Sequence, residues 1–243
     1  MWNIDLTLMD VARVSRESYA EAFRRVTGRP LVALPQLAGR SDSEIFFESL
    51  ALNDVPSAAE VSAGAAQAGQ ELLAKYAWEL AEAFGARRGL LTQQGRLLPG
   101  ATAAVRATAA LPGVIQSVLT GTIRPNAMEK LAAFGLADYF DTDIGGYGAD
   151  AYPKGSQLLS CRTQAEEKYH TRIPAGATVY LADSIRDAEA ARIADVPCIA
   201  VASGRSTASD LTAAGADVVL ADLSDTAEVA AVVDRLTRVG AGR

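Results

Sequence analysis

This 243-residue sequence contains one histidine and only two cysteines. The histidine, His170, lies in a polar helical stretch over residues 166–172, where we expect it to be exposed. The sequence therefore excludes a Ser-His-Asp triad and a histidine-rich metal site. Cys161 and Cys198 fall in segments with the pattern of buried helix or strand. We expect both to be reduced structural thiols, as in a cytoplasmic protein.

Long apolar runs and an excess of basic residues are also missing. No run reaches the ~18 apolar residues of a membrane span, and the first residues do not resemble a targeting peptide. Lysine and arginine total 23 against 29 aspartates and glutamates, which gives a net charge of −6. This balance argues against a nucleic-acid partner, and any phosphate-binding charge must be local. We therefore expect a cytoplasmic protein that binds neither membranes nor nucleic acid.

Short β-branched runs alternate with amphipathic helical runs over residues 114–222, and a closing helix follows at 226–239. This alternation predicts an α/β fold, a Rossmann-like parallel sheet with helices on both faces. Ligands of such sheets bind at the carboxyl ends of the strands. The predicted strands cover residues 114–119, 178–182, 198–201 and 217–220, and the predicted helices 124–134, 185–194, 207–214 and 226–239.

Residues 11–88 have helical periodicity and almost no strand pattern. Ser15 is a candidate N-cap for a helix to about Thr27, Ser41 or Asp42 for a second helix, and a third spans residues 57–84. Residues 28–35 and 93–99 are expected to be connections. We predict an α/β core formed by residues 1–11 and 89–243, with residues 12–88 inserted as an α-helical cap.

Polar side chains with the chemistry of a phosphate site follow three of the predicted strands. Asn3, Asp5 and Thr7 follow a short apolar start. Thr120 and Gly121 end the strand at 114–119, where a hydroxyl and backbone N–H groups can hold a phosphate. Asp183 ends another strand and Asp187 lies one helical turn further on. Carboxylate oxygens at such positions suit Mg²⁺.

These three segments, in this order, resemble the motifs of haloacid dehalogenase-like (HAD) hydrolases. The opening resembles Asp-x-Asp-Gly-Thr, the run from Leu119 to Pro125 the second motif of the phosphoglycolate-phosphatase-like branch, and the segment from Asp183 to Asp187 the fourth motif. The resemblance implies a Mg²⁺-dependent phosphatase for a small phosphorylated metabolite, with a helical cap.

The resemblance also implies a role for each residue. Asn3 occupies the position of the nucleophile, and Asp5 that of the general acid/base. Asn3, Asp5, Asp183 and Asp187 match the metal site, and Thr7, Thr120 and Gly121 the phosphate-binding residues. The family needs a basic residue between the second and fourth motifs, for which Lys154 is our candidate and Arg162, Lys168 and Arg172 are alternatives. Arg40, in a segment that resembles a cap motif, is a candidate substrate contact.

Asn3 changes what this site can do. An aspartyl-phosphate intermediate needs an attacking carboxylate, and an amide is a poor nucleophile. We expect the scaffold to hold metal and phosphoester while phosphatase activity is lost or strongly impaired. Three origins stay open: a substitution that traps substrate, a native residue, or a precursor that deamidates to aspartate. Leu6, which replaces the usual glycine, makes natural divergence plausible.

Two other functions stay open as well. A native Asn3 would make the chain a non-catalytic relative that binds a phosphometabolite or a partner protein. A phosphomutase is a further alternative, although it also needs the missing nucleophile. Only Met1 and Trp2 precede Asn3, so the first strand is expected to be shorter than the usual ~5–6 residues. Either the true N-terminus is longer or the core tolerates a short strand.

Overall fold

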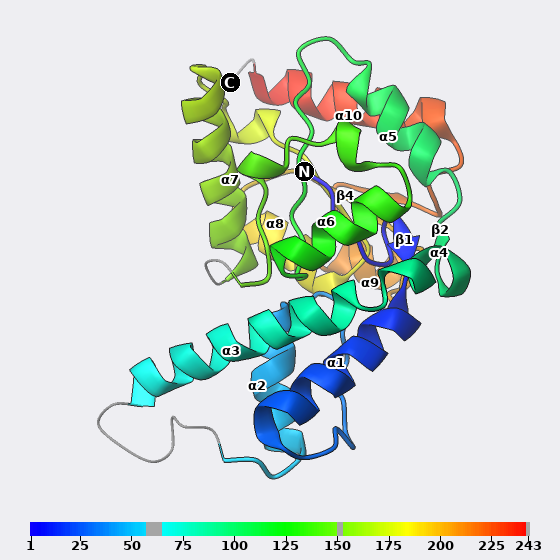
Figure 1. Cartoon of the computed structure of the whole chain (residues 1–243). Helices are drawn as coiled ribbons and strands as arrows, with labels where there is room; N and C mark the ends of the chain where they lie inside the picture. The colour runs from blue at the N-terminus through cyan, green and yellow to red at the C-terminus, as the bar shows by residue number, and fades with distance from the viewer. Residues whose placement is uncertain (57–64, 150–152, 242–243) are drawn as a thin grey trace.

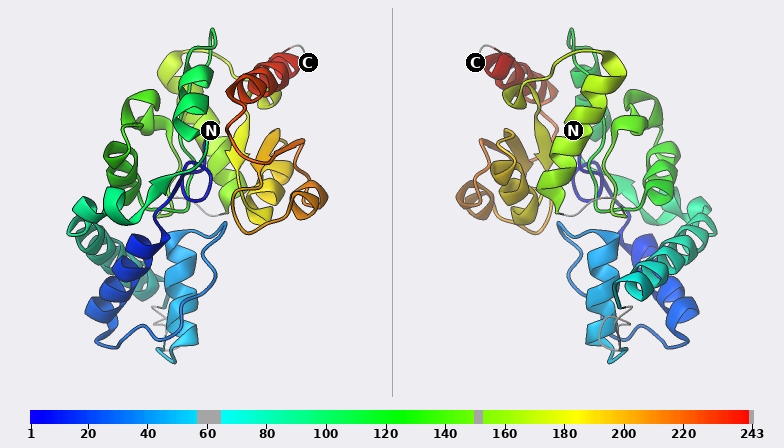
Figure 2. Two further views of the ribbon diagram at one scale, coloured as in Figure 1. Left: turned by 90° about the vertical axis from the view of Figure 1, so that its right-hand side faces the viewer. Right: turned by 90° about the vertical axis from the view of Figure 1, so that its left-hand side faces the viewer.

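The structure, a computed structural model, describes residues 1–56, 65–149 and 153–241. It has an α/β core with a group of three helices at one end (Figures 1 and 2). The central sheet contains parallel strands in the order β3 (Tyr180–Ala182), β4 (Cys198–Val201) and β5 (Val218–Leu220). Single parallel bridges extend it from Leu181 to Trp2, from Trp2 to Val118 and from Leu119 to Gly146. The parallel sheet is as predicted. The predicted strand at 114–119 is wrong in extent, because only Val118 and Leu119 contribute, through single bridges.

Alternate residues of β3 and β4 pack on opposite faces of the sheet, as the period of two in a strand requires. Leu181 and Ile199 belong to one cluster of buried side chains, and Tyr180 and Cys198 to another. Helices cover both faces, as predicted. The first cluster receives side chains from α5 (Ala101–Ala109), α6 (Arg124–Ala133) and α10 (Thr226–Ala241), and the second from α7 (Lys154–Tyr169), α8 (Ile185–Ile193) and α9 (Ala208–Ala213).

The three helices at the end of the molecule are α1 (Ala12–Thr27), α2 (Asp42–Leu52) and α3 (Ala65–Gly85). They share a third cluster of buried side chains, in which Phe46 stacks on Tyr76 with ring centroids 4.0 Å apart. Ile123 from the core joins this cluster. A separate hydrophobic cluster supports the predicted helical cap. The boundaries at residues 11 and 88 stay a prediction.

Helix starts in this region follow their local capping chemistry. Ser41 caps α2, since its hydroxyl accepts the Glu44 N–H and the Glu44 carboxylate accepts the Ser41 N–H. The predicted start of the first helix at Ser15 is wrong. The α1 helix has its N-cap at Val11, four residues earlier, and the Asp10 carboxylate accepts the Ala12 N–H. The predicted third helix includes residues 57–64, which lie outside the described residues.

A two-stranded antiparallel ribbon joins the first and second parts of the core. It pairs β1 (Met9–Asp10) with β2 (Arg96–Leu97). The prediction of a plain connection over residues 93–99 is therefore wrong, because strands of two residues carry no readable alternation. The chain reaches this ribbon through a short helix, α4 (Leu91–Gln94), and short 3₁₀ turns lie at Arg88–Leu90, Ala137–Tyr139, Thr142–Ile144 and Ala175–Ala177.

The two cysteines are buried and His170 is exposed, as predicted, and Trp2 belongs to the core. Trp2 is 1% exposed, and its indole N–H donates to Gln116 at 2.9 Å. Cys161 and Cys198 are both buried and form no disulfide, whereas His170 is exposed at the end of α7. Among the described residues, no helix combines the length and the apolar character that crossing a membrane requires.

Candidate functional site

Backbone hydrogen bonds fix the start of the chain at the centre of the sheet. Trp2 N–H donates to Ser117 O at 2.9 Å and Asn3 N–H to Leu181 O at 2.8 Å. The side chain of Asn3 therefore emerges beside the ends of both neighbouring segments. In a parallel sheet these carboxyl ends meet at one edge, where ligands bind. A cleft lies at this edge, and Asn3, Thr120 and Asp183 are among the residues that line it.

The turn after Asn3 depends on an unusual backbone conformation. Leu6 has φ 59°, in the left-handed region, which costs a side-chain-bearing residue ~1–2 kcal/mol. Its N–H donates to Met9 O at 2.7 Å, and its carbonyl accepts from Ser203 Oγ at 2.6 Å. The turn therefore requires a positive φ that glycine would adopt without this cost.

Asp183 lies directly beside Asn3. Its Oδ1 atom accepts from Asn3 Nδ2 at 2.9 Å and from Thr7 Oγ1 at 2.9 Å. Asp183 is 2% exposed. Burial raises the pKa of its carboxyl from the usual 3.8 to about 7, and the nearby Asp187 carboxylate adds to the shift. The carboxylate is thus held by two neutral donors in a poorly solvated place.

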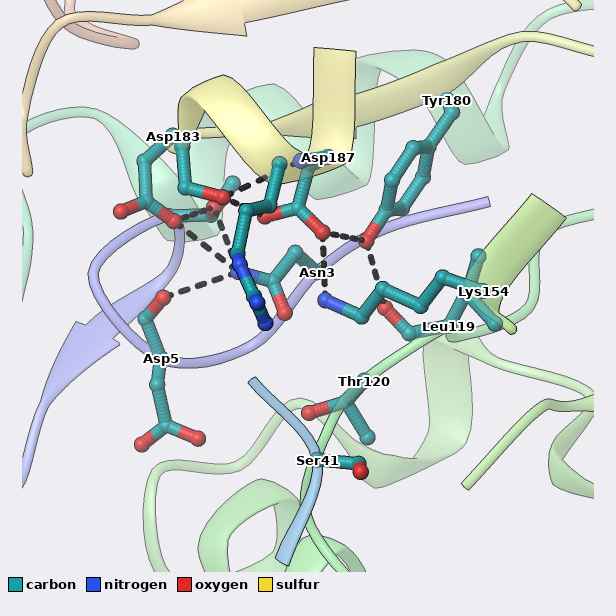
Figure 3. Close-up of polar contacts among 12 residues, drawn as sticks. Asn3, Asp5, Ser41, Leu119, Thr120, Lys154, Tyr180, Asp183 and Asp187 are labelled. Carbon is teal, nitrogen blue, oxygen red and sulfur yellow. Dashed lines mark hydrogen bonds and ion pairs between the residues drawn. The ribbon is translucent and has the colours of Figure 1, made fainter. Parts of the chain in front are cut away.

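Asp187 is completely buried and does not line the cleft itself. Lys154 Nζ and Tyr180 Oη both donate to its Oδ1 atom, and Ser184 Oγ donates to its Oδ2 atom at 2.5 Å. Figure 3 shows Lys154 reaching Asp187 from the side of the cleft opposite Asp183. Both oxygens of Asp187 are therefore occupied by donors from this chain.

The carboxylate of Asp5 points away from Asn3 and Asp183 (Figure 3). Lys130 Nζ donates to both of its oxygens, at 2.9 and 2.7 Å, and Thr122 Oγ1 donates to Oδ2 at 2.9 Å. The Lys130 side chain is 2% exposed and the Asp5 side chain 37%. Only the backbone carbonyl of Asp5 faces Asn3, at 3.0 Å from Nδ2.

Thr120 and Gly121 line the cleft, and Gly121 lies close to the backbone at the start of α2. Thr120 is 1% exposed, and its hydroxyl accepts the Thr122 N–H at 3.2 Å. A Cβ atom at Gly121 would lie only 1.9 Å from the carbonyl oxygen of Arg40. This close backbone approach between helical group and core needs glycine.

Asp42 ties the same helical group to the core. Its backbone N–H donates to Gly121 O at 2.7 Å, and its carboxylate accepts from Tyr19 Oη at 2.6 Å and from Ile123 N–H at 2.8 Å. Burial raises the pKa of Asp42 to about 6, against the opposing effects of these donors and of Lys130. Asp42 therefore contributes three contacts at the junction.

The structure brings most of the predicted site residues together. Thr7 and Asp187 are buried just behind the cleft and contact it through Asp183 and Lys154. The other predicted site residues all line it: Asn3, Asp5, Arg40, Thr120, Gly121, Lys154 and Asp183.

The four candidate basic residues differ in whether they line the cleft. Lys154 lines the cleft, whereas Arg162 and Arg172 line a different cavity that also contains Met1. Lys168 pairs with Asp141 and Asp143. Arg40 also borders the cleft, but its guanidinium pairs with Glu48 at 2.7 Å. Its role as a substrate contact stays a prediction.

Sequence reasoning missed Lys130, and it considered Asp42 only as a helix start. The helical pattern around Lys130 could have indicated its burial, because Lys130 lies on the same buried face of α6 as Asn126, Ala127 and Leu131. A lysine on such a buried face needs a partner. Nothing in the sequence indicated that its partner would be Asp5, which is 125 residues away.

The acidic side chains do not fit a magnesium ion in this arrangement. Mg²⁺ requires near-octahedral oxygen ligands at about 2.0–2.1 Å. The carboxylates of Asp5 and Asp187 are turned to Lys130 and Lys154, which leaves Asp183 with the Asn3 amide against it. Among the described residues, no group of three His, Cys, Asp or Glu side chains could hold a metal ion.

Asp42 should make the stability of the fold depend on pH. Its folded pKa of about 6 exceeds the usual 3.8, so the folded chain binds the proton more tightly than the unfolded chain does. The protonated form then stabilises the fold at low pH, and ~3 kcal/mol is lost as the pH rises from about 3 to 7. Replacing Asp42 by asparagine preserves its shape and should remove this contribution.

Urea unfolding at pH 5 and pH 8 tests this expectation. The wild type should lose ~1 kcal/mol more than the Asp42→Asn variant over this interval. Equal losses in the two proteins would contradict it. Asp210→Asn is a matched control, because Asp210 caps α9 at the surface and its pKa is lowered. The Asp210→Asn variant should therefore lose as much stability between pH 5 and pH 8 as the wild type does.

Comparisons with known proteins agree with the fold. A family model described as "haloacid dehalogenase-like hydrolase" matches residues 1–192. Among curated proteins, none matches this chain. Several solved structures have the same fold, at sequence identities that support only the fold.

Three of these structures cover nearly the whole chain. A haloacid dehalogenase-like hydrolase from Bacteroides fragilis has a TM-score of 0.61 and 21% identity, and the match covers 92% of this chain and 96% of that one. A hydrolase from Pseudomonas syringae has a TM-score of 0.63 and 19% identity, covering 93% and 94%. A predicted phosphoglycolate phosphatase from Haemophilus somnus has a TM-score of 0.62 and 16% identity, covering 94% and 95%. With the family model spanning most of its length, the chain belongs to the haloacid dehalogenase-like hydrolases.

Proposed function

We propose that this chain is the scaffold of a phosphoric monoester hydrolase that binds a small phosphorylated metabolite and, with Asn3, does not hydrolyse it. The single observation that carries the proposal is the position of Asn3. Its amide lies at the ligand-binding edge of the sheet, in hydrogen-bond contact with Asp183, and it lines the same cleft as Thr120 and Lys154.

Different residues around the cleft supply the groups that would hold a phosphate. Lys154 supplies a positive charge, and Thr120 and Gly121 supply a hydroxyl and a backbone N–H at a strand end. Asp5 is the proposed general acid/base, and it would have to leave Lys130 to act. Thr7 orients Asp183 through their 2.9 Å hydrogen bond. These roles follow from the family resemblance and from the shared cleft.

Asn3 removes the reactive atom without removing the fold. In-line attack on phosphorus needs an anionic oxygen at this position. An amide is nearly isosteric with a carboxylate but uncharged, so the ligand site is retained while the nucleophile is lost. We propose magnesium as the cofactor only for a chain with aspartate at position 3, since the present donors do not fit the ion.

A native, non-catalytic binding protein is the second candidate. The observation that favours it is Leu6, which occupies a left-handed turn (φ 59°) where the family motif has glycine. A substitution made to trap a substrate would leave that glycine alone. Two departures in one motif favour drift of the whole motif, and the ligand is then a phosphometabolite or a partner protein.

Restoring aspartate at position 3 tests the leading proposal. The Asn3→Asp variant, assayed with Mg²⁺ and an aryl phosphate, should hydrolyse the ester, while the unchanged chain should not. Calorimetry of the unchanged chain with inorganic phosphate separates the candidates. Phosphate binding without turnover supports a phosphate-binding scaffold, whereas no phosphate binding favours a partner protein as the ligand.

A further inference from the structure

Three acceptor oxygens surround the amide nitrogen of Asn3. Nδ2 lies 3.0 Å from the backbone carbonyl of Asp5, 2.9 Å from Asp183 Oδ1 and 3.3 Å from Thr7 Oγ1. Figure 3 shows the amide nitrogen joined to both Asp5 and Asp183. Asn3 is 6% exposed, so water has little access to this group. The nitrogen thus bridges a backbone carbonyl and a carboxylate.

The chemistry of these acceptors fixes the orientation of the amide. The Asp5 carbonyl has no hydrogen to donate, and Asp183 Oδ1 already accepts from Thr7 Oγ1 at 2.9 Å. Whichever atom of Asn3 faces them must therefore donate, and only the NH₂ group can. Turning the amide would bring its oxygen against both oxygens, with both hydrogen bonds lost.

The Asp5 carbonyl and the Asp183 carboxylate belong to two of the four residues that the family resemblance assigns to the metal site, Asn3, Asp5, Asp183 and Asp187. A cation and an NH₂ group cannot occupy the space between them together. A cation there would need the amide to turn. Of the three aspartates assigned to the metal site, Asp5, Asp183 and Asp187, only Asp183 has no salt bridge to a lysine among the described residues. The carboxylates of Asp5 and Asp187 are neutralised within the chain by Lys130 and Lys154.

We propose that the amide of Asn3 takes the place of the divalent cation, so that this chain binds no magnesium at the site and holds its ligand without one. The NH₂ group joins the Asp5 carbonyl to Asp183, and the lysines balance the remaining acidic groups. The part of this inference that concerns the ligand rests on the proposed function. The part that concerns the metal rests only on the hydrogen bonds of Asn3.

Titration with Mn²⁺ alone, followed by electron paramagnetic resonance of the free ion, tests the metal part. Mn²⁺ prefers the same hard oxygen ligands as Mg²⁺. The unchanged chain should show no site with a dissociation constant below ~1 mM, and Asn3→Asp should bind on the order of 100-fold more tightly. Sub-millimolar binding by the unchanged chain that Asp183→Asn abolishes would overturn the proposal. The comparison of the unchanged chain with Asp183→Asn does not require Asn3→Asp to fold.

Thermal unfolding gives a second readout. In Asn3→Asp, two carboxylates and a carbonyl face one another, so added Mg²⁺ should raise Tm by several degrees through its binding to the folded state. The unchanged chain should show no shift, because its amide already satisfies these oxygens. An equal rise of Tm in both proteins would contradict the proposal.

Calorimetry with inorganic phosphate tests the ligand part. The dissociation constant of the unchanged chain should stay within about 2-fold between Mg²⁺ and EDTA, and a loss above about 10-fold on chelation would overturn this part. If phosphate does not bind in either condition, the proposed function fails. The Mn²⁺ titration still decides the metal part.

Discussion

Asn3→Asp is expected to raise the kcat for an aryl phosphate in the presence of Mg²⁺ by at least ~10³-fold over the unchanged chain. The substitution replaces one atom and supplies the anionic oxygen that attacks phosphorus. It also replaces the NH₂ donor against Asp183 (2.9 Å) by a second carboxylate, which creates the charge that a magnesium ion requires. One change thus restores two properties together.

The dependence of this gain on other residues distinguishes it from contamination. Asn3→Ala keeps the position but supplies no nucleophile, and it should stay inactive. Adding Asp5→Asn to Asn3→Asp should remove most of the gain, because a positioned general acid/base contributes ~10²–10⁴-fold. A folded Asn3→Asp protein without turnover would contradict the proposed function, as would equal turnover in the unchanged chain.

Lys130→Met is expected to lower the free energy of unfolding by ~2 kcal/mol. Lys130 Nζ donates three hydrogen bonds, two to Asp5 and one to Thr122, from a side chain that is 2% exposed. It also lies 5.5 Å from the ring centroid of Phe84 in α3. Removing the charge leaves Asp5 without its cation. Asp5 is 37% exposed, so water offsets part of the loss, and the effect stays below that of a fully buried pair.

Lys168→Met provides the matched control for this effect. Lys168 also contacts two carboxylate oxygens, of Asp141 and Asp143, but it is 41% exposed. Exposed pairs contribute ~0–1 kcal/mol, so its replacement should change stability little. Urea unfolding of both variants measures the difference. Equal effects of the two substitutions would contradict the account of Lys130.

The parallel sheet could be predicted because its strands are short, apolar and separated by helices with clear periodicity. The predicted strand at 198–201 coincides with β4, and the helices that follow begin within one residue of prediction. The position of the N-terminal residues in the sheet was less predictable. Trp2 belongs to the sheet through single bridges to Val118 and Leu181, which are contacts across more than a hundred residues that no local pattern encodes.

The candidate site was predictable where each residue follows a strand. Asn3, Thr120 and Asp183 all do, and the sheet brings the ends of parallel strands to one edge. The direction in which their neighbours point was not predictable. Asp5 turns to a lysine on α6, and Lys154 turns to Asp187. These pairings depend on the packing of α6 and α7 against the sheet, and they decide whether a metal ion fits.

The most direct test of the central claim, that position 3 alone separates this scaffold from hydrolysis, is a rapid acid quench. The unchanged chain and Asn3→Asp are each mixed with a phosphoryl-labelled aryl phosphate and Mg²⁺, quenched within a single turnover, and the labelled peptide is identified. We predict label on residue 3 of Asn3→Asp and none on the unchanged chain. Product formation by Asn3→Asp without labelled protein, or label on another residue, would contradict the account.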